Sequence, residues 1–452
     1  MQPNPTSMSE GGTSRALAIA FATTTAMWLL SYVAMLQPGS LAGEVIFGVT
    51  ILVLCAGSAL AAIVDVECHS ISRAARRGAE VGLISACINL MLIGSLVGGS
   101  GDAAMWFVGL FGASLGLGAF GGLLGGMIRS DSWSARPAIV WHGIFAAVCA
   151  VLTFLMLVSG GIVTGFEAGL AVPDWPNSYG HNMLLYPLSE MVADLDSGIF
   201  YEHAHRLTGM FVGLASMTLC IVLWAADRRT WVGILGSLVL LMVIGQGVLG
   251  GLRVTGVLTM SAEASVLSPS TALGIVHGVF GQIVFAFMVF IAAITSTRWL
   301  RGPSAERVNG ASFARFLAWA LLITLVLQLV IGAMYRHLAM DLELDGARTN
   351  HLLLAHIALA ALVMLLAIIN GIRAIGSPAG GRVLQRIGIA LCILVTLQVL
   401  LGIVATVVVL AREPDAAVPI VEVIITSAHQ ANGGLLLAAA VLLTAWQRRL
   451  EC

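Results

Sequence analysis

The chain has 452 residues, of which 59% are hydrophobic and only 10% are charged, and its mean hydropathy is +0.97. Soluble globular domains carry about 25% charged residues, so this composition excludes that class and indicates a membrane-embedded protein. The net charge of -1 provides no basic field, and no nucleic-acid partner is expected.

Apolar runs long enough to cross a lipid bilayer recur along the whole chain. A helix needs roughly 20 residues for this, and helices are required because hydrocarbon offers no hydrogen-bond partner to a backbone amide. Twelve such runs are expected near residues 15–36, 43–66, 78–99, 104–128, 138–163, 199–226, 231–252, 268–296, 311–335, 350–372, 384–410 and 423–446. The sequence therefore predicts an all-α polytopic membrane protein of about twelve transmembrane helices.

The basic residues, all of them arginine, distinguish the two sides of this predicted protein. Arginine favours cytoplasmic loops, and both termini are therefore predicted to be cytoplasmic. Exclusive use of arginine is typical of a GC-rich bacterial genome, so the expected location is the bacterial inner membrane. Most of the arginines lie after even-numbered spans, at 73–77, 129–136, 228–229, 298–307 and 373–386.

The seven cysteines show no pairing pattern. None of them forms CxxC or CxxCH, so neither a disulfide framework, nor a zinc site, nor covalently attached heme c is predicted. Any heme is therefore expected to be bound without a covalent link.

One predicted external connection, from about 164 to 198, is unusually long. It contains the sequence PDWP at 173–176 and Pro187, together with five acidic residues and no arginine. Loops of this length inside a compact protein are more often functional than idle.

The last eight predicted helices look like two copies of one four-helix unit. QGVLGGLRV (246–254) resembles QVLLGIVAT (398–406), and VHGVFGQ (276–282) resembles AHQANGG (428–434). Such internal repeats are common in membrane proteins. The predicted division is an accessory four-helix membrane segment at 1–130, a first bundle at 131–300 and a second bundle at 301–452, the two bundles being pseudo-symmetric.

Four histidines fall into register within this repeat, namely His205, His277, His356 and His429. Each lies one to two turns below the external end of its helix. A single intramembrane histidine is most simply a packing residue, but two facing helices that each supply one imidazole provide axial ligation for heme iron. The four histidines therefore predict two hemes, with the histidines as ligands to the heme iron.

Except for His351, the remaining histidines fit structural roles better than ligand roles. His351 lies five residues before His356 and is a reserve ligand. The structural group comprises His69, His142, His181, His203 and His337.

Glu202 is three residues before His205, so both side chains project from one helix face. An ionisable group inside a membrane is a candidate for function, and Glu202 is the predicted catalytic residue because it could exchange protons during an oxidation. The structural alternative is a carboxylate that pairs with Arg206 at the water boundary. Arg206 could instead bind a heme propionate.

The stretches GGIVTGFEAGLAVPDWPNSYG (160–180) and EHAHRLTG (202–209), together with the four histidines, resemble the heme A synthase family. The resemblance covers about residues 138–447. It implies a heme-dependent membrane oxidoreductase that oxidises the C8 methyl of heme O to a formyl group and so makes heme A for terminal oxidases. By position it implies Glu202 as the catalytic carboxylate, His205 and His277 as ligands of the substrate heme, and His356 and His429 as ligands of the cofactor heme b.

The chain departs from the family pattern in three ways. Its first external loop lacks the cysteine pair of some relatives, and Ile357 follows the third histidine where relatives often have arginine, which leaves Arg336 or Arg348 as propionate partners. The first four helices lie outside the pattern and are expected to be an accessory or partner-docking bundle. Expected partners are heme O, the lipid bilayer, an unidentified electron donor, and heme O synthase or terminal oxidase subunits.

Two other functions compete with the synthase. A di-heme b-type membrane cytochrome that transfers electrons to or from quinol would also need four histidines, but it would not need Glu202. A transporter built on repeats would show charged residues or broken helices near the bilayer midplane, and helices five to twelve contain neither.

Overall fold

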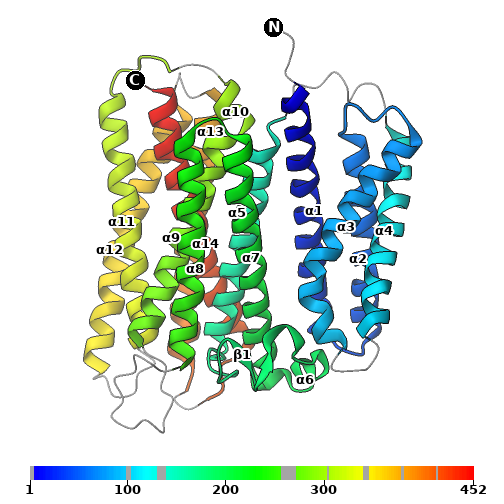
Figure 1. Cartoon of the computed structure of the whole chain (residues 1–452). Coiled ribbons are helices and arrows are strands. Elements are labelled where there is room, and N and C mark those ends of the chain that lie inside the picture. The colour runs from blue at the N-terminus through cyan, green and yellow to red at the C-terminus, as the bar shows by residue number, and fades with distance from the viewer. Residues whose placement is uncertain are drawn as a thin grey trace. The chain divides into compact units, whose positions relative to one another are not determined.

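The computed structural model describes residues 5–97, 103–129, 139–255, 271–302, 305–338, 346–377, 381–413 and 416–451 (Figure 1). Within these ranges, the side chains of residues 5–10, 93, 95–97, 103, 196 and 346–350 fall outside the description.

Long helices dominate the described chain. The first part contains α1 (Pro5–Met35), α2 (Leu41–Ile63), α3 (Ile71–Val97), α4 (Ala103–Ile128), α5 (Trp141–Gly165), β1 (Asn177–Ser178), β2 (His181–Asn182), η2 (Met183–Leu185), α6 (Leu188–Val192), η3 (Leu195–Ser197), α7 (Ile199–Ala226) and α8 (Thr230–Thr255). The second part contains α9 (Thr271–Thr295), α10 (Thr297–Arg301), α11 (Ala311–Leu338), α12 (Gly346–Ile375), α13 (Gly381–Ala411) and α14 (Ile420–Leu450).

Among the described residues, eleven helices are long and apolar enough to cross a membrane. The prediction of an all-α polytopic membrane protein is confirmed, and the predicted span 199–226 coincides with α7. The other long helix, α3, is not among the eleven, and the side chains at its end lie outside the described part.

The chain forms two compact units. The first comprises Met1–Leu152, Ala171–Leu240 and Thr295–Thr297, and the second comprises Thr153–Leu170, Leu241–Ile294 and Arg298–Cys452. The three segments expected from the sequence follow the helical repeat instead, and that division stays a prediction.

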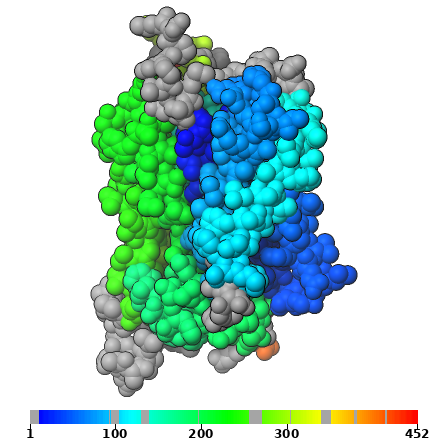
Figure 2. All heavy atoms as spheres, turned by 45° about the vertical axis from the view of Figure 1, so that its right-hand side comes forward, coloured from blue at the N-terminus to red at the C-terminus, as the bar shows by residue number. Residues whose placement is uncertain are grey.

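Small residues let the helices α2, α3 and α4 approach closely. A Cβ atom on Gly78 would overlap the backbone of α4 at Gly118 and Gly122, and one on Gly121 or Gly125 would overlap α2. Close contact of this kind is how helices associate in lipid, where no hydrophobic effect drives them together. The four N-terminal helices thus form one packed bundle, of which α4 is drawn in cyan (Figure 2).

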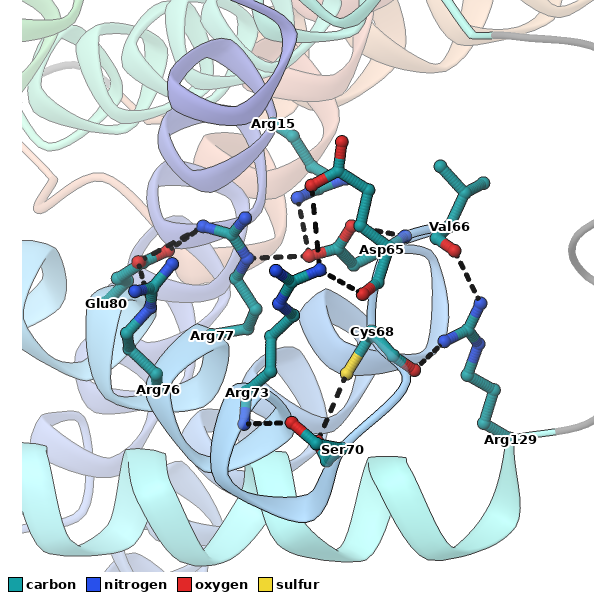
Figure 3. A network of polar contacts seen from close by, with 11 residues as sticks. Arg15, Asp65, Val66, Cys68, Ser70, Arg73, Arg76, Arg77, Glu80 and Arg129 are labelled. Atoms are coloured by element: carbon teal, nitrogen blue, oxygen red, sulfur yellow. Dashed lines mark hydrogen bonds and ion pairs between the residues drawn. The ribbon is translucent and has the colours of Figure 1, made fainter. Parts of the chain in front are cut away.

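A network of ion pairs closes one end of this bundle (Figure 3). The buried Asp65 carboxylate lies 2.9 Å from Arg15 Nη2 and accepts a hydrogen bond of 2.6 Å from Arg77 Nε. Arg77 also pairs with Glu80, and Arg129 donates to carbonyls of the loop that follows Asp65. Burial alone would raise the pKa of Asp65, but the guanidinium groups of Arg15 and Arg77 outweigh it and lower that pKa.

The core of the second unit lies between α11, α12, α13 and α14. It contains the buried side chains of Leu321 and Leu325 from α11, Leu391 from α13, and Leu436 and Leu443 from α14. This packing holds α12 and α14, which carry two of the predicted heme ligands, in one bundle.

Candidate functional site

Glu202 lies in the first turn of α7 and is only 4% exposed. Its Oε2 accepts a hydrogen bond of 2.7 Å from the backbone N–H of Val172, and its Oε1 accepts one of 2.6 Å from Arg206. The carboxylate is therefore fixed from two sides, by its own helix and by the segment 171–198, which we call the PDWP loop. The predicted pairing with Arg206 is present, and it coexists with a second contact that the sequence did not suggest.

Arg206 also holds the PDWP loop. Its Nη2 donates to the carbonyl oxygen of Val172 at 2.7 Å, and its Nη1 donates to those of Asp174 and Asn177 at 2.7 and 3.0 Å. A planar guanidinium suits this multiple bonding because its donors point in fixed directions. The role of Arg206 as a propionate partner stays a prediction.

The PDWP loop is itself tightly tied. The Asp174 carboxylate accepts hydrogen bonds from the backbone N–H groups of Tyr179 and Gly180 at 2.7 and 2.8 Å, and the Tyr179 hydroxyl donates to the carbonyl of Ala171. Gly180 has a φ of 76°, a conformation that glycine adopts without strain. The loop is therefore an ordered platform beside the start of α7.

His203 supports the same platform. Its ring is fully buried, its Nδ1 lies 3.1 Å from the Ser178 hydroxyl, and the ring of Tyr186 packs 5.2 Å away. His203 therefore has the structural role expected from the sequence, on a different face of α7 from His205.

The rings of His356 on α12 and His429 on α14 lie next to each other in the second unit, edge to face. Their ring centroids are 6.3 Å apart and the ring planes are inclined by 68°. A metal–imidazole bond is about 2 Å long, so two imidazoles on opposite sides of one iron place their centroids roughly 6 Å apart. The separation in this structure fits axial ligation of one heme.

Glycines on the neighbouring helices leave room for these rings. A Cβ atom on Gly332 would lie 2.9 Å from the His356 ring, and one on Gly402 would lie 3.0 Å from the His429 ring. Any side chain larger than hydrogen would displace the imidazoles. These glycines form a cradle in which each imidazole lies close against the neighbouring helix.

A glutamine side chain lies beside each of the two rings. Gln328 Nε2 lies 3.1 Å from His356 Nδ1, and Gln398 Nε2 lies 3.3 Å from His429 Nδ1. Gln328 Oε1 is buried without a hydrogen-bond partner. Gln328 Nε2 also donates to the carbonyl oxygen of His356 at 2.9 Å, which fixes the amide with its nitrogen toward the ring.

The other predicted pair is divided between the two units. His205 lies half-buried in α7 of the first unit, and His277 lies in α9 of the second unit. In the second unit, Gln246 Nε2 donates to the carbonyl of His277 at 3.2 Å, and His277 Nδ1 is buried without a hydrogen-bond partner. The His205–His277 pair stays a prediction.

The remaining predicted residues lie at the ends of helices. Arg336, at the end of α11, donates to the carbonyl of Thr164 at 2.9 Å. Arg348 is in the first turn of α12, and its side chain lies outside the described residues. His351 is exposed on α12.

Sequence reasoning missed the glutamines, and it gave His337 a structural role. The ring of His337 lies close to α9. A Cβ atom on Gly274, one turn before His277, would lie 2.9 Å from this ring. The glutamines could have been found, because Gln246 and Gln398 are the first residues of the two matched repeat stretches.

The chain is similar to proteins of one known family. The model of the family COX15-CtaA, described as cytochrome oxidase assembly protein, matches residues 143–441. The chain is similar to the heme A synthase of Parvibaculum lavamentivorans, at 28% identity over 218 residues, which are 43% of this chain and 59% of the relative. It is also similar to that of Beijerinckia indica subsp. indica, at 28% over 212 residues, 41% of this chain and 55% of the relative.

A third relative is the heme A synthase of Bradyrhizobium sp., at 27% identity over 235 residues, 45% of this chain and 60% of the relative. The chain thus spans less than two thirds of the length of these curated relatives. No solved structure matches it. Because the family model matches well over half of the chain, from within α5 to within α14, the chain belongs to the COX15-CtaA family of cytochrome oxidase assembly proteins.

Proposed function

We propose that the chain is a heme A synthase, which oxidises the C8 methyl of heme O to a formyl group and yields heme A for terminal oxidases. One observation carries the proposal: the buried Glu202 carboxylate, fixed by Val172 and Arg206, lies one helical turn before His205. Membership of the family and similarity to proteins named heme A synthase support the same activity. A cytochrome that only transfers electrons would not need this carboxylate.

The four histidines have distinct proposed roles. His205 and His277 bind the substrate heme O, and His356 and His429 hold heme b as cofactor. The ring separation and the glycine cradle support the second assignment. When bound, heme b supplies electron transfer, and dioxygen and an electron donor come from outside the chain.

The protein groups near the substrate orient it and exchange protons. Glu202 is the proposed catalytic carboxylate, because a fixed carboxylate one turn from the ligand can accept protons released as the methyl group is oxidised. Arg206, Arg336 and Arg348 are the proposed partners of the heme propionates, since guanidinium groups bind carboxylates in two-point contacts.

The proposed location is the bacterial inner membrane, with both termini in the cytoplasm. The arginine distribution along the sequence supports this orientation. The proposed partners, besides heme O and the bilayer, are an electron donor and either heme O synthase or terminal oxidase subunits, because hemes that are poorly soluble are best passed between membrane proteins.

The test is expression in a host that makes heme O but no heme A, followed by chromatography and mass analysis of the extracted hemes. The unaltered chain should produce heme A. Glu202→Ala should lower the yield about 100-fold, the range that a lost general base usually costs.

Glu413→Ala is the matched control, because this exposed carboxylate lies after α13 and outside the long helices. It should leave the yield unchanged. Bound heme b without heme A, when heme O and an electron donor are supplied, would instead identify the chain as an electron-transfer cytochrome.

A further inference from the structure

The four N-terminal helices lie outside the segment that the family model matches. Within the first unit, however, α1 and α3 contact the two elements that fix Glu202, namely α7 and the PDWP loop. The purpose of the bundle can therefore be sought in these contacts.

The first contact is with α7 itself. The ring of Tyr32 on α1 packs 5.2 Å from that of Phe200, two residues before Glu202. About three turns further along α7, the ring of Phe211 packs 4.8 Å from that of Trp28 on α1. The indole N–H of Trp28 also donates to Asn89 on α3 at 2.9 Å, which holds the ring in place. The first turns of α7 are thus packed against a rigid aromatic surface.

The second contact is with the PDWP loop. Tyr186, Met191 and Phe200 form a buried cluster on the loop and α7, and Tyr32 and Met35 of α1 pack against it. On α3, a Cβ atom at Gly94 would overlap the carbonyl oxygen of Leu184 in η2. The green loop residues accordingly lie against the end of the bundle drawn in blue and cyan (Figure 2).

The loop passes this support on to Glu202. Tyr186 packs against His203, the neighbour of Glu202, and Val172 at the start of the loop donates directly to the Glu202 carboxylate. Movement of the loop away from α3 would withdraw the Val172 N–H and the carbonyls that orient Arg206. The Glu202 carboxylate would then lose its contact with the loop.

We propose that the α1–α4 bundle is a brace that positions the Glu202 carboxylate, with Tyr32 and the close contact at Gly94 as its positioning residues. A misplacement of about 1 Å at a reacting group can cost on the order of 100-fold in rate. A brace built from packed aromatic rings and a helix–loop contact without intervening side chains prevents such movement.

Two variants with matched controls test the brace in the full chain. Tyr32→Ala removes the ring that supports Phe200, whereas Tyr32→Phe keeps it. Gly94→Val forces α3 and η2 apart, whereas Gly112→Val on α4 adds the same side chain where a Cβ would meet nothing within 4 Å.

Two measurements are made on each protein. Hydrogen exchange with mass spectrometry reports the protection of the peptides that cover 171–198, and heme extraction reports the ratio of heme A to heme b. Tyr32→Ala and Gly94→Val should speed loop exchange on the order of tenfold and lower the heme ratio at least about tenfold, with the heme b content unchanged. Both controls should behave like the unaltered chain.

Unchanged loop exchange in both variants would overturn the brace, and so would faster exchange with an unchanged heme ratio. An equal loss in Gly112→Val would reduce the effect to general destabilisation and would also overturn it. The inference rests on the proposed function only for the heme ratio. If the unaltered chain makes no heme A, the proposed function fails, and the exchange data still decide whether the bundle holds the loop.

Discussion

Glu202 and the His356–His429 pair lie in different surroundings. Glu202 is held by charged and backbone groups, with Arg206 and the Val172 N–H both within hydrogen-bond distance. The two histidines lie half-buried beside glycines and are accompanied by neutral amides. A buried charge needs fixed donors because burial without them is costly. The two imidazoles lie close to the neighbouring helices, and glycines leave the space for them.

The largest expected effect concerns the His356–His429 pair. His356→Ala or His429→Ala would remove a proposed heme ligand, and the affinity for heme b should fall at least about 100-fold, because loss of a mere supporting contact already costs up to that much. Optical spectra of the purified chain measure the bound heme. His351→Ala should retain heme b, and loss of heme in this variant alone would transfer the ligand role to His351.

The next effect tests the close contact between Gly402 and the His429 ring. Gly402→Leu places a side chain against the His429 ring and should lower heme b affinity about tenfold, since overpacking costs about 1–3 kcal/mol. Heme titration monitored by absorbance measures it. Gly247→Leu on α8 is the control because a Cβ there meets nothing within 4 Å. Equal affinities in the two variants would contradict the cradle.

A third prediction concerns the ion pairs of the N-terminal bundle. Asp65→Asn removes the carboxylate that pairs with the buried Arg15, and it removes one of the two carboxylates that pair with the half-buried Arg77. It should destabilise the bundle by about 3 kcal/mol. Thermal unfolding in detergent measures this. Glu67→Gln is the control, because the Glu67–Arg73 pair is largely exposed and contributes little. Equal melting temperatures for the two variants would contradict the role of Asp65.

The same residue predicts a pH dependence. The pKa of Asp65 is lower in the folded chain than its ordinary value of about 4, so the unfolded state takes up the proton first. The stabilisation is therefore complete above about pH 4 and is lost as the pH falls through the lower folded value. Asp65→Asn should remove this acid dependence of the melting temperature, and its persistence would assign it to another group.

The smallest expected effect concerns the amide beside His356. Gln328 Nε2 lies 3.1 Å from His356 Nδ1, so the amide is a polar group beside a proposed heme ligand. Apolar surroundings disfavour the more highly charged ferric state. Gln328→Leu should therefore raise the reduction potential of the bound heme with little loss of heme, as measured by redox titration. Thr396→Val, on the exposed side of α13, should leave the potential unchanged. A potential that moves equally in both variants would exclude the glutamine as the cause.

Much of the fold could be predicted from the sequence. Spans such as 199–226 and 311–335 are visible because lipid imposes length and apolarity on each helix separately. The small PDWP-loop elements could not be predicted in this way, since β1, β2 and η2 depend on hydrogen bonds such as those of Asp174 rather than on any periodic pattern.

The sequence by itself determined the membrane class, and it predicted the repeat and the register of the four histidines, because each depends on local composition or spacing. Only the tertiary structure decided that Val172 donates to the Glu202 carboxylate, that Gly332 and Gly402 lie against the rings of His356 and His429, and that Tyr32 supports Phe200. These contacts join residues far apart in the chain, and they follow from how the helices pack against one another, which no single helix specifies.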